Sequence, residues 1–350
     1  MTIQKQSVGL DISKKTFTAC ICTLVSGQIC SFSQVKSFAN EKRGFNQLIR
    51  WVRKHCIAEV ETVFLMEATG VYHEQLAQQL YELKQTVHVA LPNKTKHYFA
   101  SLNIKSKTDA IDARVLSQFG VERAHKPWSP PSPTLLKLRD LTRYYVQLME
   151  QKTALGNLLE GKEQGHEVES FILKSNKKLI KQVDQQLTGI KNQVDKILQG
   201  DPSLKERVER VATIKGVGIF TVVTIVAETL GFEHFNSIRQ VVSYAGYDVV
   251  QNESGTAVKG QTRISKKGNR YIRNALYFPA MVACRYNETM KANYVRIIQK
   301  KSSKMIGQVA IQRKLLGLIY TLWKNNTVYD EDYQKGVAPV TTTEATLGSS

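Results

Sequence analysis

Val8-Gly9-Leu10-Asp11 and Thr62-Val63-Phe64-Leu65-Met66-Glu67 are the stretches that decide the fold of the first part of this chain. Each is a short apolar run that ends on a carboxylate, which is typical of a buried strand that stops at the edge of a sheet. Asp109 and Asp112 open a helix-like stretch at a spacing of three residues, so both side chains lie on one helix face. We therefore expect Asp11, Glu67, Asp109 and Asp112 to meet at one edge of a sheet.

Strand-like and helix-like patterns alternate around these runs as far as residue 126. Besides the Glu67 run, we predict strands over residues 8–12, 16–22, 31–35 and 86–91. Asn40 is predicted to cap a helix whose apolar stripe is Phe45, Leu48, Ile49 and Val52, and a second helix carries Leu76, Leu80 and Leu83. Three strands followed by alternating helices and strands resemble an RNase H-like mixed sheet.

The remaining chain is predicted to be mostly helical, which gives the fold class α/β plus α. A proline-rich linker over 127–134 separates residues 1–126 from heptad-patterned coiled-coil helices over 135–200. Whether those helices pair within the chain or between chains stays open at this point. A C-terminal domain over 201–333 follows, and the low-complexity tail 334–350 is predicted to be disordered.

The charge of the chain indicates a polyanionic partner. The formal net charge is +19, and because the excess is so large we favour nucleic acid over a membrane surface. No apolar run approaches the ~20 residues of a membrane span. The five cysteines complete no zinc-binding set, which favours free thiols in a reducing, cytoplasmic compartment. Four carboxylates in so basic a protein suggest Mg²⁺, or alternatively Mn²⁺, held against phosphodiesters.

A second group of candidate residues lies in the C-terminal part of the chain. Basic side chains alternate there with glycines and hydroxyl groups, which favours contact with a phosphate backbone: Lys259, Arg263, Lys266, Lys267, Arg270 and Arg273. Gly216 and Gly218 resemble the turn of a helix-hairpin-helix, whose backbone N–H groups can approach phosphate. Ser254 lies between Glu253 and Gly255, a context that fits a turn serine as well as a nucleophile.

Taken in order, these motifs resemble the DEDD-type insertion-sequence transposases that act as bridge-RNA-guided recombinases with a catalytic serine. The matching stretches span most of the chain: Gly9-Leu-Asp11-Ile-Ser-Lys, Met66-Glu67-Ala-Thr-Gly70, Lys107-Thr-Asp109-Ala-Ile-Asp112-Ala-Arg, Gly216-Val-Gly218, Glu253-Ser254-Gly255 and Arg263-Ile-Ser-Lys-Lys-Gly-Asn-Arg270. One departure is that Val249 stands where such proteins usually carry proline.

The resemblance implies a RuvC-like domain in which Asp11, Glu67, Asp109 and Asp112 hold Mg²⁺, and a C-terminal domain in which Ser254 is the nucleophile. It also implies target and donor DNA as substrates and a structured non-coding bridge RNA as guide. The implied assembly is a homo-oligomer, a dimer of dimers, in which carboxylates of one subunit face the serine of another.

Two other functions remain open on the sequence. The enzyme alternative is a hydrolytic, metal-dependent nuclease or Holliday-junction resolvase in which Ser254 is only structural. The non-enzyme alternative is a basic RNA-binding scaffold whose acidic cluster serves folding alone.

Overall fold

Two compact units make up the chain, Met1–Pro130 and Pro131–Ser350, in this computed structural model. The structure describes residues 2–68, 70–165, 168–250, 263–299 and 303–330 in full, and residues 253–254 and 258–259 by their backbone alone. The predicted tail 334–350 lies outside the described residues.

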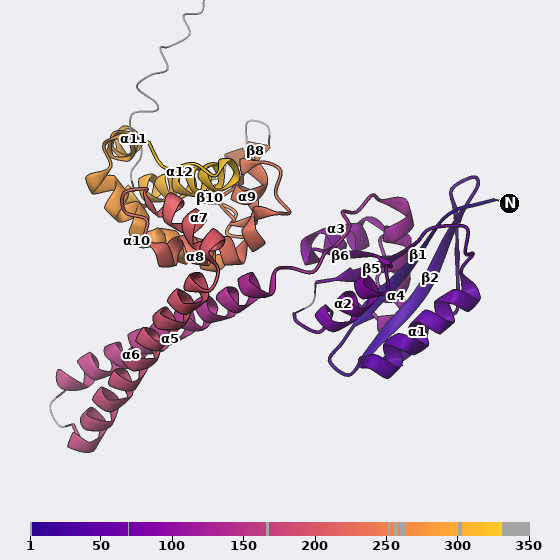
Figure 1. Cartoon of the computed structure of the whole chain (residues 1–350), viewed down its shortest axis with the longest axis horizontal. Helices are drawn as coiled ribbons and strands as arrows, with labels where there is room; N and C mark the ends of the chain where they lie inside the picture. The colour runs from indigo at the N-terminus through magenta and orange to yellow at the C-terminus, as the bar shows by residue number, and fades with distance from the viewer. Residues whose placement is uncertain are drawn as a thin grey trace, which may run out of the picture. The chain divides into compact units, whose positions relative to one another are not determined.

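The first unit is built on a mixed sheet (Figure 1). Its strands are β1 (Ile3–Ile12), β2 (Thr16–Val25), β3 (Ile29–Phe32), β4 (Lys36–Ala39), β5 (Thr62–Glu67) and β6 (Thr86–Ala90). The order is β3-β2-β1-β5-β6, with β4 paired to β2; β1 runs antiparallel to β2 and parallel to β5, and β5 runs parallel to β6. This arrangement confirms the predicted RNase H-like sheet.

Helices cover both faces of this sheet because β1 and β5 are buried on both sides. Alternate residues of a strand point to opposite faces. Val8 and Leu10 pack with α1 (Lys42–His55) and α2 (Glu74–Glu82), whereas Leu65 packs with α3 (Pro92–Ser101) and α4 (Asp109–Glu122). Gly9 faces α4, and a Cβ added there would lie 2.1 Å from the backbone nitrogen of Ser117. The helix that carries Asp109 and Asp112 therefore lies directly against the strand that carries Asp11.

Several local predictions for this unit were wrong. The predicted strand 31–35 ends at Phe32, and a separate strand, β4, follows. The reason is that the ten residues of β2 pair with β3 along one half and with β4 along the other. Asn40 does not cap α1; its Nδ2 donates instead to the carbonyl oxygens of Ser13 and Tyr72. Leu83 is exposed because α2 ends at Glu82.

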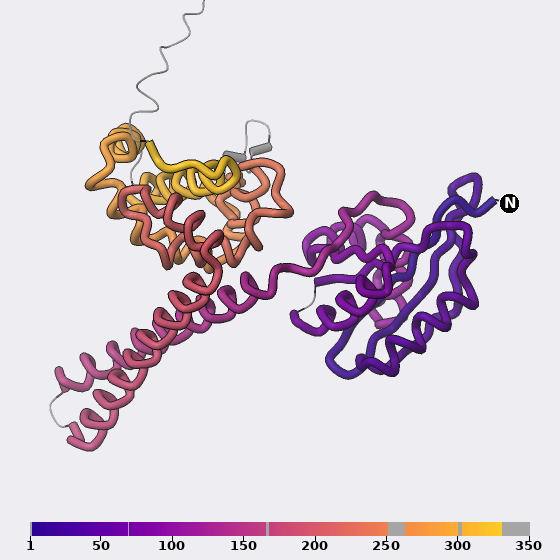
Figure 2. Tube along the Cα trace, in the orientation of Figure 1, coloured from indigo at the N-terminus to yellow at the C-terminus, as the bar shows by residue number. Residues whose placement is uncertain are grey.

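Where the structure describes it, the second unit is helical apart from two short ribbons, and its first two helices lie side by side (Figure 2). These are α5 (Pro133–Glu163) and α6 (Ser170–Gln199), with Leu148, Leu187, Ile190 and Val194 buried between or beside them. The heptad-patterned helices thus pair within the chain.

A globular helical core follows that pair. It contains α7 (Pro202–Ala212), α8 (Ile219–Glu228), the short 3₁₀ helix η1 (Leu230–Phe232), α9 (Ile238–Tyr244), α10 (Arg270–Tyr286), α11 (Glu288–Ile298) and α12 (Lys304–Asn325). The ribbons are β7 (Val249–Val250) with β10 (Arg263–Ile264), and β8 (Glu253–Ser254) with β9 (Val258–Lys259). Fully buried side chains of α12, among them Ile311, Leu315 and Ile319, fill the centre of this core. Within the described part of the chain, no helix is both long and apolar enough to cross a membrane.

Candidate active site

Strand register brings the carboxylates of β1 and β5 to one edge of the sheet. Leu10 of β1 is opposite Met66 of β5 in the parallel ladder, so Asp11 and Glu67, one residue further on, lie at the carboxyl ends of neighbouring strands. At the same edge α4 begins with Asp109 and Asp112 in its first turn. Thr108 caps this helix, because its Oγ1 accepts a hydrogen bond from the Ile111 nitrogen at 3.3 Å. The positive end of the helix dipole thus lies where the acids gather.

Burial and the neighbouring acids both act on the carboxyl group of Asp11. Burial, and then the negative charges of Asp112, Asp109 and Glu67, raise the pKa of Asp11 to about 6, while Lys107 lowers it. Burial is also the main cause that raises the pKa of Asp112, opposed by Lys107 and assisted by Asp109 and Glu67. The four carboxylates that the sequence singled out therefore interact with one another at one site.

Two neighbours of the carboxylates were missed from the sequence. The buried Thr95 donates its hydroxyl to Glu67 Oε2 at 2.7 Å, which fixes the orientation of that carboxylate. The Lys107 Nζ lies 3.9 Å from Asp112 Oδ2 and is otherwise exposed. Lys107 could have been found, since it stands two residues before Asp109 in the same motif. Thr95 could not, because it belongs to a helix that no motif marks.

The chemistry of this edge fits a hard divalent cation. Carboxylate oxygens are the ligands that Mg²⁺ prefers, and a cation would offset both the burial and the repulsion that raise the pKa of Asp11. Asp112 Oδ1 is buried without a hydrogen-bond partner, as an atom reserved for a ligand would be. Among the described residues, however, no three acidic, histidine or cysteine side chains already stand at the distances of a metal site. Metal binding at this edge would require the acidic side chains to draw together.

Ser254 lies in the second unit, on the short ribbon β8–β9. Its backbone pairs with Val258, and that of Glu253 pairs with Lys259. The side chains of Ser254 and Lys259, and Gly255 and Gly260 altogether, lie outside the described residues. Only the backbone of the two paired segments of this hairpin is therefore described.

The segments around Gly246 and Gly268, which flank this hairpin in the sequence, pack closely against each other. We call these two segments the base of the hairpin. Gly246 has a φ of +75°, and a Cβ on Gly268 would lie 2.4 Å from the Tyr244 carbonyl oxygen. Arg273 Nη1 donates to the Ala245 carbonyl oxygen at 2.7 Å. Part of the hydrogen-bonding capacity of Arg273 therefore holds the base together. The other predicted phosphate contacts near the hairpin whose side chains are described are exposed: Arg263, Lys266, Lys267 and Arg270.

A buried ion pair connects α5 to this base and was missed from the sequence. Arg143 of α5 donates from Nε and Nη2 to both carboxylate oxygens of Glu228, at 2.6 and 2.8 Å. The Glu228 side chain is 0% exposed. Asn269 Nδ2 donates to Glu228 Oε2 at 2.6 Å, while Asn269 Oδ1 caps α10 by accepting from Tyr271. One carboxylate thus ties α5, the end of α8 and the start of α10 together.

The predicted glycine turn joins α7 to α8. Gly216 has a φ of +92°, and its Cα faces Val282 of α10 so closely that a Cβ would lie 3.0 Å from that side chain. Gly218 is the residue that precedes α8, and a Cβ there would meet nothing within 4 Å. Gly216 thus serves packing, whereas the space beside Gly218 is open to a ligand.

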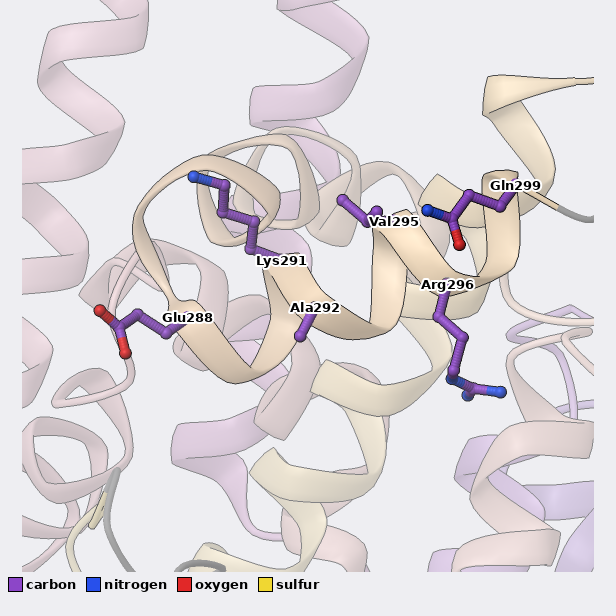
Figure 3. A pocket seen from close by; sticks show the side chains of 6 residues that line it. All are labelled: Glu288, Lys291, Ala292, Val295, Arg296 and Gln299. Carbon is purple, nitrogen blue, oxygen red and sulfur yellow. The ribbon is translucent and has the colours of Figure 1, made fainter.

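A surface hollow of about 580 Å³ lies over α11 (Figure 3). Its lining comes from a single helix and the residue after it: Glu288, Lys291, Ala292, Val295, Arg296 and Gln299. The charged side chains diverge from one another, so the hollow holds no convergent set of polar groups (Figure 3). None of the predicted site residues lines it.

The fold and the acidic edge define the first unit as an RNase H-like domain. Residues 8–162 match the transposase family DEDD_Tnp_IS110, and residues 208–295 match the transposase IS116/IS110/IS902 family. The chain therefore contains IS110-family transposase domains, and it is a DNA-cutting enzyme of transposition and recombination. DEDD domains of this kind typically use divalent metal ions.

Two curated proteins are similar to this chain over nearly its whole length. The chain is 29% identical over 336 residues to the pilin gene-inverting proteins of Moraxella lacunata and Moraxella bovis, an alignment that covers 94% of this chain and 99% of each relative. Among solved structures, the chain is similar to T. thermophilus RuvC in complex with a Holliday junction substrate, with 9% identity and a TM-score of 0.28 over 35% of this chain and 99% of that one.

Proposed function

We propose that this protein is an RNA-guided recombinase that cuts and rejoins donor and target DNA through a covalent phosphoserine intermediate. The observation that carries the metal-dependent part is the gathering of four carboxylates at one sheet edge, where burial and then the repulsion among these groups raise the pKa of Asp11 to about 6. Mg²⁺ held by Asp11, Glu67, Asp109 and Asp112 would polarise the scissile phosphate and stabilise the oxygens on either side of it.

Ser254 is the proposed nucleophile. Its oxygen would attack phosphorus, one bridging P–O bond would break, and the released sugar hydroxyl would take up the serine proton. Rejoining is the reverse reaction with the hydroxyl of the exchanged strand, and the phosphoserine bond conserves the energy that it needs. Support comes from the hairpin that carries the Ser254 backbone and from the exposed cations Lys266, Lys267 and Arg270 near its base, which suit a phosphate backbone.

A guide RNA and an oligomer complete the proposal. A net charge of +19 suits two polyanions, and base pairing by a guide would leave the protein to contact backbone and shape. The outer halves of α5 and α6 expose large apolar side chains among the described residues, notably Phe171, Ile172, Leu179 and Leu158. Exposed apolar surface of this kind suits contact with a second copy. The pilin gene-inverting relatives are named for a DNA rearrangement, which agrees with recombination as the reaction.

The test uses the full-length protein, labelled donor and target DNA, the non-coding RNA encoded beside the gene, and Mg²⁺. We expect Ser254→Ala to abolish denaturation-resistant protein–DNA adducts and recombination while RNA binding persists. Asp11→Ala should abolish adducts, recombination and cleavage alike. Wild-type strand exchange by Ser254→Ala would overturn the serine role.

The hydrolytic alternative makes a different prediction in the same assay. If the protein is a nuclease or junction resolvase without serine chemistry, the Ser254→Ala variant should produce free DNA ends at the wild-type rate. Neither the wild-type protein nor the variant should then form a covalent adduct with DNA. Recombination that depends on Ser254 but continues without the encoded RNA would instead reject the guide while leaving the covalent chemistry standing.

A further inference from the structure

Helix α1 has an unusually basic exposed face. Its 14 residues contain no aspartate or glutamate, and its apolar residues Phe45, Leu48 and Val52 are turned into the core. Five exposed cations share the opposite side: Lys42, Arg43, Arg50, Arg53 and Lys54. Among the described residues none of the five forms an ion pair. We call these five residues the α1 basic face.

The spacing of these cations gives a continuous stripe. Arg43, Arg50 and Lys54 are separated by seven and four residues, so they lie in one row, and Lys42 and Arg53 form the adjacent row eleven residues apart. The row from Arg43 to Lys54 is about 17 Å long at 1.5 Å per residue. At about 3.4 Å of duplex axis per phosphate of one strand, that length matches roughly five phosphates.

The stripe begins near the strand ends that carry Asp11 and Glu67, on the face of the sheet opposite α4. Asn40, just before α1, donates from Nδ2 to the carbonyl oxygen of Ser13, two residues after Asp11, at 3.0 Å. It donates also to the carbonyl oxygen of Tyr72, five residues after Glu67, at 3.1 Å. Its backbone nitrogen donates to Lys15 at 2.9 Å, and the exposed Lys14 and Lys15 stand between this edge and the helix. Figure 1 shows α1 running along the outside of the sheet from there.

We propose that the α1 basic face binds the phosphates of the DNA duplex that flanks the strand held at the carboxylate edge. This inference rests on the proposed function for its choice of DNA, because the stripe begins beside the Ser13–Lys15 turn that follows Asp11. A duplex leaving that edge over Lys14 and Lys15 would meet Lys42 and Arg43 first and Lys54 last. The contacts are to phosphate, so they confer affinity and direction without reading sequence.

The test compares two triple variants of the full-length protein. R43Q/R50Q/K54Q removes one row of the face, and K174Q/K178Q/K181Q removes three exposed lysines of α6 that are likewise without ion pairs among the described residues. Both change the net charge by the same amount. Binding to a labelled DNA duplex is measured by fluorescence anisotropy in EDTA over a range of salt concentrations, so that no cleavage occurs.

The slope of log affinity against log salt concentration is negative, and we expect the α1 variant to make it less negative by about 2.7. Binding near physiological salt should weaken about 10- to 100-fold. The α6 variant should change the slope by less than about one. Equal losses in the two variants would overturn the proposal, because net charge alone would then explain them. The proposal would also be overturned if the α1 variant lost binding to an RNA duplex of the same length while its binding to DNA stayed unchanged.

Two further measurements keep the result interpretable. Thermal melts of both variants check folding, and protection of Lys42 and Lys54 from acetylation by DNA in the wild-type protein tests the face without any substitution. Unprotected lysines at saturating DNA would also overturn the proposal. Because these readouts are taken without metal, they stay separate from the Ser254 and Asp11 tests: cleavage chemistry could fail while this face still binds DNA, and the reverse.

Discussion

At the scale of single residues, Asp11 is kept partly protonated by its surroundings. Its pKa of about 6 lies above the ordinary 3.8, so the folded state favours the neutral acid. A raised folded pKa gives stability that is fully present below 3.8 and is lost as the pH rises through 6. At neutral pH without metal, ionised Asp11 therefore destabilises the first unit.

Asp11→Asn should for this reason stabilise the metal-free protein at pH 8, by about 1–2 kcal/mol, which discounts the ~3 kcal/mol of the full shift for solvent access. The gain should vanish near pH 4, where the wild-type acid is neutral as well. Thermal melts in EDTA across this pH range measure both effects. In Mg²⁺ the wild-type protein should gain stability and Asp11→Asn should not; a variant less stable than wild type at pH 8 in EDTA would contradict the assignment.

At the scale of secondary-structure elements, the acidic edge depends on how closely α4 approaches β1. A Cβ on Gly9 would lie 2.1 Å from Ser117 N and 2.2 Å from the Ala113 carbonyl oxygen, both backbone atoms that cannot move alone. The absence of a side chain at Gly9 is thus what allows α4 to lie so close to β1. This explains why Gly9 belongs to the same motif as Asp11.

We predict that Gly9→Ala destabilises the first unit by about 3 kcal/mol or more and displaces Asp109 and Asp112. The matched control is Gly156→Ala in α5, where a Cβ meets nothing within 4 Å. That change should be neutral or stabilising by up to about 1 kcal/mol. Chemical denaturation of the two variants provides the comparison, and equal effects would contradict the close-packing argument.

The ion pair between Arg143 and Glu228 is a second contact that joins secondary-structure elements. Removing Arg143 leaves the Glu228 carboxylate buried without its cationic partner and, among the described residues, with only Asn269 donating to it, so Arg143→Ala should cost about 3–5 kcal/mol. Lys152→Ala on the same helix breaks an exposed pair with Asp184 and should cost at most about 1 kcal/mol. Replacing both buried partners, as in R143M/E228L, should cost less than Arg143→Ala alone. Urea denaturation measures all three, and a mild effect of Arg143→Ala would show that Glu228 is satisfied by other groups.

At the scale of the whole molecule, the exposed apolar end of the α5–α6 pair is the proposed contact with a second copy of the chain. Phe171 is 73% and Leu179 45% exposed on α6, although both are apolar. If this end contacts a second copy, F171D/L179D should lower the oligomer mass measured by light scattering by at least half. K178D/K181D on the same helix also adds acidic groups, yet it should leave the mass unchanged. Equal masses for wild type and F171D/L179D would place the contact elsewhere.

The sequence by itself determined the carboxylates and the class of sheet, because strand ends and helix starts are marked by local periodicity. Asp11 and Glu67 could be predicted to meet once each was recognised as the end of a buried strand. It also predicted the heptad-patterned helices α5 and α6, since heptad spacing is a local property of a helix, but it left open whether they pair within the chain or between chains.

Only the tertiary structure decided which side chains support those residues. Asn40 holds two loops instead of capping a helix, Thr95 orients Glu67, and Arg143 reaches Glu228 across 85 residues of sequence. The physical reason is that each of these contacts joins segments far apart in the chain, and its stability comes from burial that exists only after the sheet and the helices have packed.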